Sequence, residues 1–207
     1  MARIYLVRHA ESVANTRGIY QGQTYDTPLS PLGRLQAQAL ADYFLNHHLD
    51  HLVVSPLLRT RQTAGKVGVT QKLPLNLDSR IIETNHGRWE GISKFEIQNR
   101  WPDVISVWNT RPSQAVFPDG ESFIQTQARV LSWWQEIVNL PGDTLVITHD
   151  NIIRIILAHL DRMDLDRIWD FDLHPASVTI VENNRTLTLN DTSHLDGLLA
   201  NLDQHAL

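Results

Sequence analysis

Three polar clusters, each containing residues that can bind or attack a phosphate group, follow three short apolar runs in this 207-residue chain. Arg8-His9 follows Ile4 to Val7, Ser55 to Arg59 follows Leu52 to Val54, and Thr148-His149 follows Leu145 to Ile147. A guanidinium matches phosphate oxygens two at a time, and an imidazole is a nucleophile when neutral or a charged donor when protonated. If the three runs are neighbouring strands, their carboxyl ends bring these side chains into one cationic pocket.

Such a pocket suits a phosphate dianion, because fixed Arg and His cations can supply the charge neutralisation that Mg²⁺ supplies elsewhere. Each residue alone also has a structural interpretation. A His after a strand is more often hydrogen-bonded and structural than nucleophilic, and an Arg near a helix start is more often on the surface. Because these residues occur together at three strand ends, the phosphate-binding interpretation becomes about as well supported as the structural one.

The elements that must position these clusters follow an α/β pattern. Each apolar run precedes a stretch of helical periodicity, which predicts a three-layer α/β/α sandwich with a mostly parallel central sheet. In the first helical stretch, one apolar face is formed by Leu32, Leu35, Ala39, Leu40 and Tyr43. Ser55-Pro56 is typical of an N-cap followed by proline at the first helical position, which would put Arg59 at the end of the first turn.

Two later segments complete the predicted fold. Residues 178–182 and 185–189 flank Asn183-Asn184, which predicts a tight hairpin and antiparallel strands. Between about residues 85 and 121 the periodicity breaks into short amphipathic pieces rich in Trp, Arg and Pro. We interpret this stretch as a cap insertion within one domain, 1–207; the alternative is a surface excursion with its own small core.

Composition limits the partners. The net charge of −5, from 18 Lys+Arg and 23 Asp+Glu of interspersed sign, gives no basic stripe for nucleic acid or anionic lipid. The absence of cysteine excludes thiolate nucleophiles and disulfides. No segment approaches the ~18 apolar residues of a membrane span, so a cytoplasmic protein with a small-molecule partner is expected. The chain is compatible with a homodimer, but its sequence does not reveal the oligomeric state.

Six ordered motifs resemble those of the histidine phosphatase superfamily, also called phosphoglycerate mutase-like, in its phosphatase branch. They are Leu6-Val7-Arg8-His9-Ala10-Glu11-Ser12 with Asn15; Asp26-Thr27-Pro28-Leu29-Ser30 with Gly33; Ser55 to Ala64; Glu83 with Gly87, Trp89, Glu90 and Gly91; Pro118-Asp119-Gly120-Glu121-Ser122; and Thr148-His149. The resemblance covers about residues 3 to 182. It implies a metal-independent phosphomonoester phosphatase without a cofactor.

The resemblance also implies roles for individual residues. His9 would be the nucleophile that forms a phosphohistidine. Glu83 would protonate the leaving alkoxide and then activate water, which requires a partly raised pKa. The phosphate oxygens would be held by Arg8, Asn15, Gln21, Gly22, Arg59 and His149.

The sequence departs from the family pattern at two positions. The usual glycine after each catalytic histidine is Ala10 in the first motif and Asp150 in the last. Ala10 would be strained if its φ were positive. The Asp150 carboxylate would repel a phosphate unless it points away or pairs with a cation such as Arg154, and a plain helix N-terminal role is an equal alternative.

Other functions stay open as alternatives. A mutase would carry an Arg and a Tyr where this chain has Thr84-Asn85-His86, although Asn151 resembles the mutases. A non-catalytic phospho-ligand binder would be expected to have lost the nucleophile, which is present. A metal site at His47-His48 and His51 is weaker than a solvated helix end. The cap aromatics favour a substrate with an apolar or ring-containing part, unless they are the cap's own core.

Overall fold

The computed structural model describes residues 2–202 and 205, which form one six-stranded sheet in the order β3-β2-β4-β1-β5-β6. The strands are β1 (Arg3–Arg8), β2 (His51–Val54), β3 (Asn76–Leu77), β4 (Thr144–Thr148), β5 (Val178–Glu182) and β6 (Arg185–Asp191). The pairs β1–β4, β4–β2 and β2–β3 are parallel, whereas β5 is antiparallel to both β1 and β6. The three apolar runs therefore become adjacent strands, as the sequence predicted.

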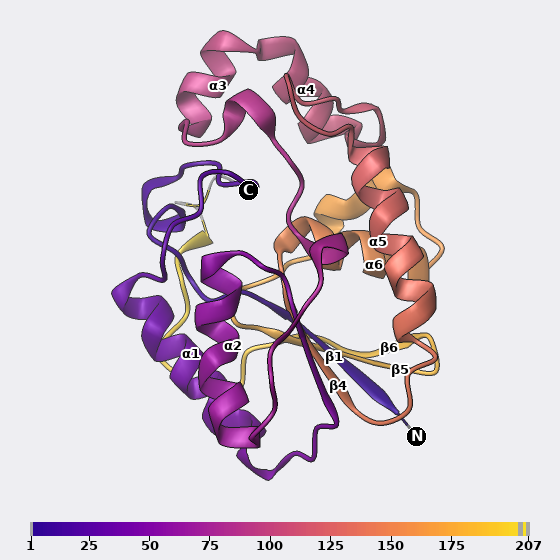
Figure 1. Cartoon of the computed structure of the whole chain (residues 1–207). Coiled ribbons are helices and arrows are strands. Elements are labelled where there is room, and N and C mark those ends of the chain that lie inside the picture. The colour runs from indigo at the N-terminus through magenta and orange to yellow at the C-terminus, as the bar shows by residue number, and fades with distance from the viewer. Residues whose placement is uncertain (1, 203–204, 206–207) are drawn as a thin grey trace.

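Helices cover both faces of the sheet. The α-helices are α1 (Pro31–Tyr43), α2 (Leu58–Gln71), α3 (Lys94–Arg100), α4 (Pro102–Thr110), α5 (Phe123–Ile137) and α6 (Asp150–Leu160), and the 3-10 helices are η1 (Asn15–Arg17), η2 (Phe44–Asn46), η3 (Ser79–Ile81), η4 (Gly87–Trp89), η5 (Pro112–Gln114) and η6 (Leu165–Asp170). Figure 1 shows α1 and α2 on one side and α5 and α6 on the other. This arrangement is the predicted three-layer sandwich.

The alternating direction of side chains along a strand explains how one sheet packs against a helical layer on each face. In β1, Leu6 packs into the apolar cluster that contains α5 and α6, whereas Tyr5 and Val7 pack into the cluster that contains α1 and α2. Successive side chains of a strand point to opposite faces, so a continuous apolar run supplies both cores. A strand of this kind is buried throughout, which fixes the position of the polar residues that follow it.

The predicted hairpin is confirmed, and its second strand is two residues longer than expected. Asn183 and Asn184 join β5 to β6 with φ values of 51° and 55°. Two consecutive residues with positive φ make the turn whose twist matches that of the flanking strands, and Asn tolerates this conformation better than most residues.

Two local predictions were wrong. In α1 the inward face carries Gln36, Ala37 and Leu40, whereas Leu35 is 56% exposed. Gln36 can be buried because its amide accepts from Glu11 N and donates to the Leu198 carbonyl. In the second case, α2 begins at Leu58 without a side-chain cap, because the Ser55 hydroxyl bonds His149 instead.

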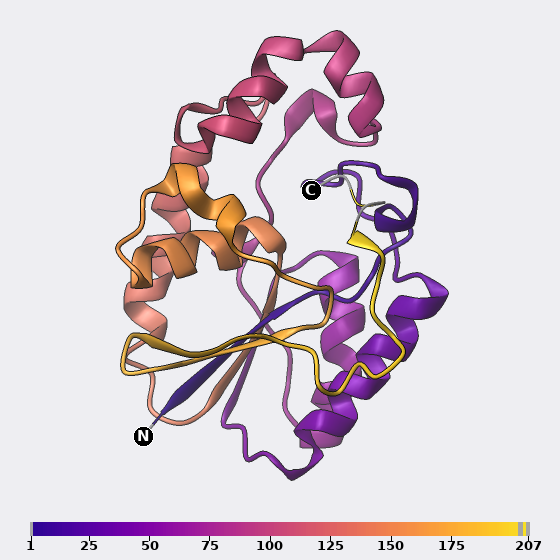
Figure 2. The ribbon, with the colours of Figure 1, turned by 180° about the vertical axis from the view of Figure 1, so that it is seen from behind.

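The segment between β3 and α5 lies beyond the carboxyl ends of the parallel strands, where Figures 1 and 2 show α3 and α4 as a separate layer above the sheet. Its large aromatic side chains, Trp89, Trp108 and Phe117, are at most 1% exposed, and Phe117 contacts both tryptophans edge to face. These side chains belong to the same apolar cluster as α5 and α6, so the core of the segment is continuous with the core on that face of the sheet.

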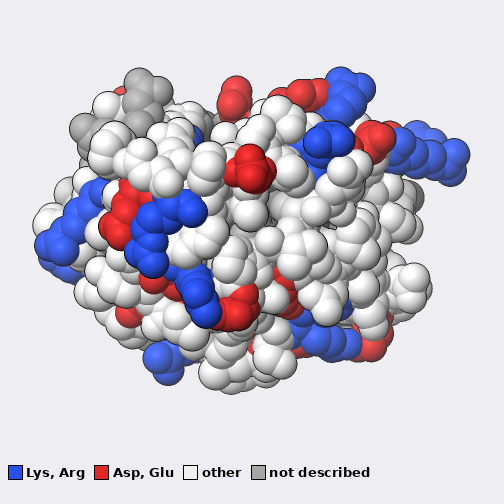
Figure 3. Space-filling view, turned by 90° about the horizontal axis from the view of Figure 1, so that it is seen from above, with Lys and Arg blue, Asp and Glu red and all other residues white. Residues whose placement is uncertain are grey.

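The surface agrees with the charge pattern of the sequence. On the face seen in Figure 3, Lys and Arg alternate with Asp and Glu rather than forming a continuous basic stripe. Within residues 2–202, no helix has the length and apolar character needed to cross a bilayer.

Candidate active site

His9 stands directly after β1 and is held there by its main-chain N–H, which donates to the Thr148 carbonyl at the end of β4. The residue is 3% exposed, and its Nδ1 lies 2.8 Å from the Ala10 carbonyl oxygen. A carbonyl only accepts, which assigns the proton to Nδ1 and leaves Nε2 unprotonated. Burial and the charges of Arg59 and Arg8 hold the pKa of His9 well below its ordinary value. The ring is therefore neutral at neutral pH.

Arg59, the second residue of α2, lies beside this unprotonated nitrogen. Its Nε donates to His9 Nε2 at 3.3 Å, its NH2 donates to the Gly22 carbonyl at 2.9 Å, and its NH1 pairs with Asp26 Oδ1 at 3.1 Å. The guanidinium is 1% exposed, so little of its charge is screened by water. The Arg59 guanidinium is thus fixed next to the predicted nucleophile, His9.

Arg8 and Asp150 form a buried ion pair at the opposite wall, with 3.1 Å between NH1 and Oδ1. Asp150 also pairs with Arg154, and Arg8 donates to the Leu173 carbonyl. Although burial raises the pKa of Asp150, the charges of Arg154 and Arg8 bring it below its ordinary value. Of the possibilities considered for Asp150, the structure shows pairing with a cation, and the three residues together keep a net positive charge.

Glu83 is 3% exposed, and burial raises its pKa to about 7. The Thr84 N–H donates to its Oε1 at 2.8 Å, and this bond and the Arg59 charge limit the rise. A carboxyl group that titrates near neutral pH can donate a proton in one step and accept one in the next. The raised pKa predicted for Glu83 is therefore present.

His149 is fully buried beside His9, with ring centroids 5.3 Å apart. Its Nε2 bonds the Ser55 hydroxyl at 2.7 Å, and its Nδ1 has no hydrogen-bond partner among the described residues. Burial and the positive charge of Arg59 keep the pKa of His149 well below its ordinary value. Of the predicted site residues, His149 alone is set behind the pocket wall rather than lining it.

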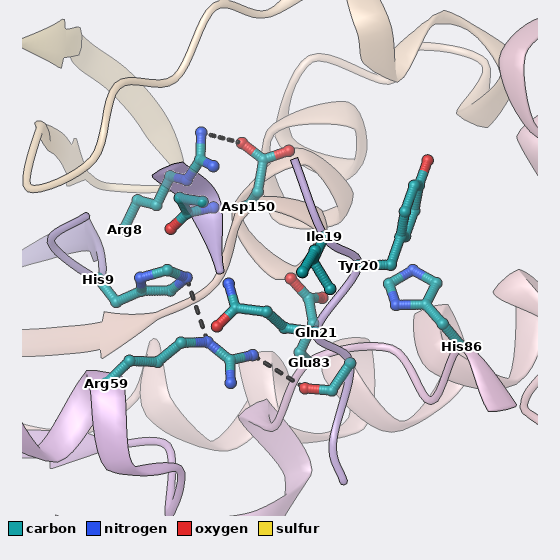
Figure 4. Close-up of a pocket in the computed structure, with 11 residues that line it drawn as sticks. Arg8, His9, Ile19, Tyr20, Gln21, Arg59, Glu83, His86 and Asp150 are labelled. Atoms are coloured by element: carbon teal, nitrogen blue, oxygen red, sulfur yellow. Dashed lines mark hydrogen bonds and ion pairs between the residues drawn. The ribbon is translucent and has the colours of Figure 1, made fainter. Parts of the chain in front are cut away.

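The pocket brings the other predicted residues together, as Figure 4 shows. It is lined by Arg8, His9, Asn15, Ile19, Tyr20, Gln21, Gly22, Arg59, Glu83, His86 and Asp150. Tyr20 and His86 lie across from Arg8 and His9, with Gln21 and Glu83 between the two groups. The sequence reasoning did not assign Ile19, Tyr20 or His86 to the site, since nothing in their spacing distinguishes them from core residues.

The departure at Ala10 is harmless. Ala10 is fully buried, its N–H donates to the Thr63 hydroxyl, and it is not among the described residues with positive φ. An alanine methyl costs nothing in ordinary backbone conformations. Asn151, the feature shared with mutases, lies outside the pocket lining, with its amide nitrogen 3.4 Å from the Thr84 hydroxyl.

Gly22, by contrast, cannot carry a side chain. Its φ is +56°, and a Cβ would lie 1.9 Å from Glu90 Oε1, the oxygen that accepts from Gln23 N and His86 N. Gly22→Ala is expected to lower the melting temperature and to reduce kcat/KM for p-nitrophenyl phosphate by about tenfold or more, because left-handed strain costs about 1 kcal/mol and the loop must move.

A matched control for Gly22→Ala lies within α2. A Cβ at Gly65 would meet nothing within 4 Å, and its backbone is helical. Gly65→Ala should raise stability by about 0.5–1 kcal/mol and leave kcat/KM unchanged. Equal melting temperatures for the two variants would contradict the strain assigned to Gly22.

The three histidines considered as a metal site, His47, His48 and His51, contact other groups. His47 Nδ1 bonds the Tyr43 carbonyl, His51 Nε2 bonds the Pro141 carbonyl, and His48 lies 3.3 Å from Asp50. Among residues 2–202 and 205, no group of three or more His, Cys, Asp or Glu is arranged to hold a metal ion.

Comparison with known proteins places this site in a family. Residues 4–189 match the sequence model of the histidine phosphatase superfamily (branch 1). Phosphoserine phosphatase 1 of Hydrogenobacter thermophilus is 34% identical over 94% of this chain and 95% of its own length. A 2,3-bisphosphoglycerate-dependent phosphoglycerate mutase of Cytophaga hutchinsonii is 26% identical over 94% of each chain.

A solved structure gives the same assignment. YhfR of Bacillus stearothermophilus superposes with a TM-score of 0.87 at 29% identity, over 94% of this chain and 100% of that one. The order of the motifs, the topology of the sheet and the similar proteins all indicate the same family. The chain belongs to the histidine phosphatase superfamily, branch 1, and is a phosphoric monoester hydrolase.

Proposed function

We propose that this chain hydrolyses small phosphomonoesters without a metal ion, through a phosphohistidine on His9. The observation that carries the proposal is the fixed tautomer of His9, with Nδ1 donating to Ala10 O and Nε2 left as a neutral nucleophile beside Arg59. Arg8 and Arg59 supply the positive charge that the transferring phosphoryl group needs. Asn15, Gln21 and Gly22, which also line the pocket, complete the set of phosphate ligands. His149 is fully buried and outside the pocket lining, so we assign it no direct contact with the phosphate.

In the first step His9 Nε2 attacks phosphorus in line with the leaving oxygen. The N–P bond forms as the P–O bond breaks, and Glu83 transfers its proton to the departing alkoxide. The alcohol leaves, and Glu83 becomes a carboxylate. The pKa of about 7 supports this role, because a substantial fraction of Glu83 is protonated at neutral pH.

In the second step the Glu83 carboxylate accepts a proton from water, whose oxygen attacks the phosphohistidine phosphorus. The N–P bond breaks, inorganic phosphate leaves, and His9 and Glu83 return to their starting states. The proton that Glu83 gives up in the first step is thus recovered in the second.

We propose that residues 1–207 act as one unit, with the segment of about residues 85–121 as a cap that limits substrate size. Trp89, Trp108 and Phe117 are buried in the cap core, so their rings offer no stacking platform to a ring-containing substrate. This arrangement favours a compact alkyl phosphate over a large aromatic ester. Phosphoserine, the substrate named for the Hydrogenobacter relative, is the first compound to assay.

Mutase activity is the second candidate, supported by the relative that carries this name. A mutase must keep its phosphohistidine from water until a second hydroxyl arrives. This chain has Thr84-Asn85-His86 where mutases place an Arg and a Tyr for phosphoglycerate, which favours hydrolysis. In an assay with 3-phosphoglycerate and catalytic 2,3-bisphosphoglycerate, release of inorganic phosphate without 2-phosphoglycerate is expected.

The test of the phosphohistidine route is direct trapping of the intermediate. Wild-type protein in EDTA should be mixed with p-nitrophenyl phosphate, quenched in alkali and digested, and the peptide containing His9 analysed by mass spectrometry. A phosphoryl group that is stable in alkali, labile in acid and located on His9 is expected. Phosphate on any other residue, or turnover that stops in EDTA, would reject the proposed route.

A further inference from the structure

Arg129, which lies outside the pocket lining, holds the segment that carries Glu83. Arg129 projects from α5 and donates to the carbonyls of Arg80, Ile82 and Glu83 at 2.9, 2.6 and 2.9 Å. It also pairs with Glu121 through two contacts, 2.8 Å from Nε and 3.0 Å from NH2. A guanidinium has five N–H donors, and here all five are used.

Glu121, which closes the cap segment just before α5, binds the same strip of chain from the other side. Its Oε2 accepts from Asn85 N at 2.8 Å and from the Thr126 hydroxyl at 3.2 Å. Side-chain exposures of 19% for Arg129 and 21% for Glu121 place the pair mostly out of water, where it is stronger than a surface pair. The main chain on both sides of Glu83 is therefore tied to α5.

The loop that carries Gln21 and Gly22 reaches the same point. Gln23, one residue after Gly22, donates to the Glu83 carbonyl at 2.7 Å, so that oxygen accepts from both Gln23 and Arg129. The Glu83 carboxylate itself accepts a single hydrogen bond from the described residues, from its own neighbour Thr84 N. Its position is consequently set by the main chain more than by partners of the side chain.

We propose that the Arg129–Glu121 pair is a positioning device for the proton donor. It fixes the main chain of residues 80–85 so that the Glu83 carboxyl stands within reach of the leaving oxygen. Neither residue lines the pocket, so both act through Glu83 rather than on substrate. The inference rests on the proposed function, because it presumes that Glu83 donates the proton.

The same segment provides a matched control. Arg80, which pairs with Asp78 inside the segment, also links residues 78–82 to α5 through Glu136, but its side chain is 37% exposed and that of Glu136 is 65% exposed. Its carbonyl, not its side chain, is the group that Arg129 binds. Arg80→Met therefore removes a link between the same two elements without disturbing the contacts of Arg129.

The experiment compares two aryl substrates of similar shape. Phenyl phosphate has a poor leaving group, with a pKa near that of tyrosine at about 10, and needs a proton donor more than p-nitrophenyl phosphate does. In Arg129→Met, kcat/KM for phenyl phosphate should fall about tenfold more than kcat/KM for p-nitrophenyl phosphate. Arg129→Lys and Glu121→Gln should show a smaller loss of the same kind, and Arg80→Met none.

The outcomes distinguish the positioning role of Arg129 from the proton-donor role of Glu83. An equal loss on both substrates, or no loss on either, would overturn the positioning role of Arg129. If Arg129→Met does not fold, as judged by its melting curve, Arg129→Lys and Glu121→Gln decide the question by the same ratio. Glu83→Gln is measured in parallel: if it leaves the ratio unchanged, the proton-donor role in the proposed function fails first, and the inference fails with it.

Discussion

His9→Ala is expected to reduce turnover of p-nitrophenyl phosphate in EDTA by at least about 10⁴-fold, the scale of loss when a covalent nucleophile is removed. The reason lies in the state of the ring. Nδ1 donates to the Ala10 carbonyl and the pKa is well below its ordinary value, so His9 presents an unprotonated Nε2 at neutral pH. No neighbour can replace it, since Arg59 is a cation and His149 is set behind the wall.

A matched control for the loss of a histidine ring is His47→Ala. His47 stacks on Tyr43 at the opposite end of the sheet and lies outside the pocket lining. Its replacement should leave kcat/KM unchanged. Activity retained in His9→Ala would reject the covalent route. If wild type shows no turnover between pH 5 and 8, phosphate binding measured by calorimetry would favour the binder alternative over the hydrolase.

The fold was predictable because its strongest signals are local. The runs that became β1, β2 and β4 are apolar on both faces, as strands buried between two helical layers must be. Asn183-Asn184 specified its turn through the conformations that asparagine tolerates. The inward face of α1 was not predictable by hydrophobicity, because Gln36 is buried through hydrogen bonds to Glu11 and Leu198, residues far away in sequence.

The site was predictable where chemistry follows a strand directly. Arg8 and His9 were expected in the pocket and line it, because their motif coincides with the end of β1. Glu83 also lines the pocket, but it follows η3 rather than a strand and was expected only from the family resemblance. The role of Ser55 was missed for the opposite reason. Its position before a proline indicates a helix cap, yet its hydroxyl bonds His149, which is 94 residues away in the chain.

The positions of Arg129 and Glu121 in the sequence do not indicate that they hold the segment of Glu83. The turn motif that contains Glu121 was recognised, but a carboxylate that binds the main chain at Asn85 can be found only in three dimensions. Asp150 lies between these cases. Pairing with a cation such as Arg154 was one of the possibilities left open by the sequence, and both residues lie on α6 four positions apart, whereas the second pair, with Arg8, depends on the β1–β4 register.

Glu83→Gln is expected to reduce kcat/KM for phenyl phosphate by about 10²- to 10³-fold at pH 6 and to reduce that for p-nitrophenyl phosphate much less. In wild type the protonated fraction of Glu83 falls above its pKa of about 7. The wild-type profile for phenyl phosphate should therefore decline above about pH 7, and the variant should show no such limb. A wild-type decline that persists in Glu83→Gln would assign the titration to another group.

The same substitution should stabilise the protein in alkali, which distinguishes loss of chemistry from loss of structure. Burial raises the pKa of Glu83 from 4.5 to about 7 on folding, so the folded chain binds the extra proton between these values. The contribution of the protonated Glu83 to the free energy of unfolding is therefore fully present below about pH 4.5. It decreases by about 3 kcal/mol as pH rises through 7, because the buried group must then ionise. Glutamine never ionises. The melting temperature of Glu83→Gln should exceed that of wild type by several degrees at pH 8.5 and match it more closely at pH 5, while Glu136→Gln, on the exposed side of α5, should show no such difference.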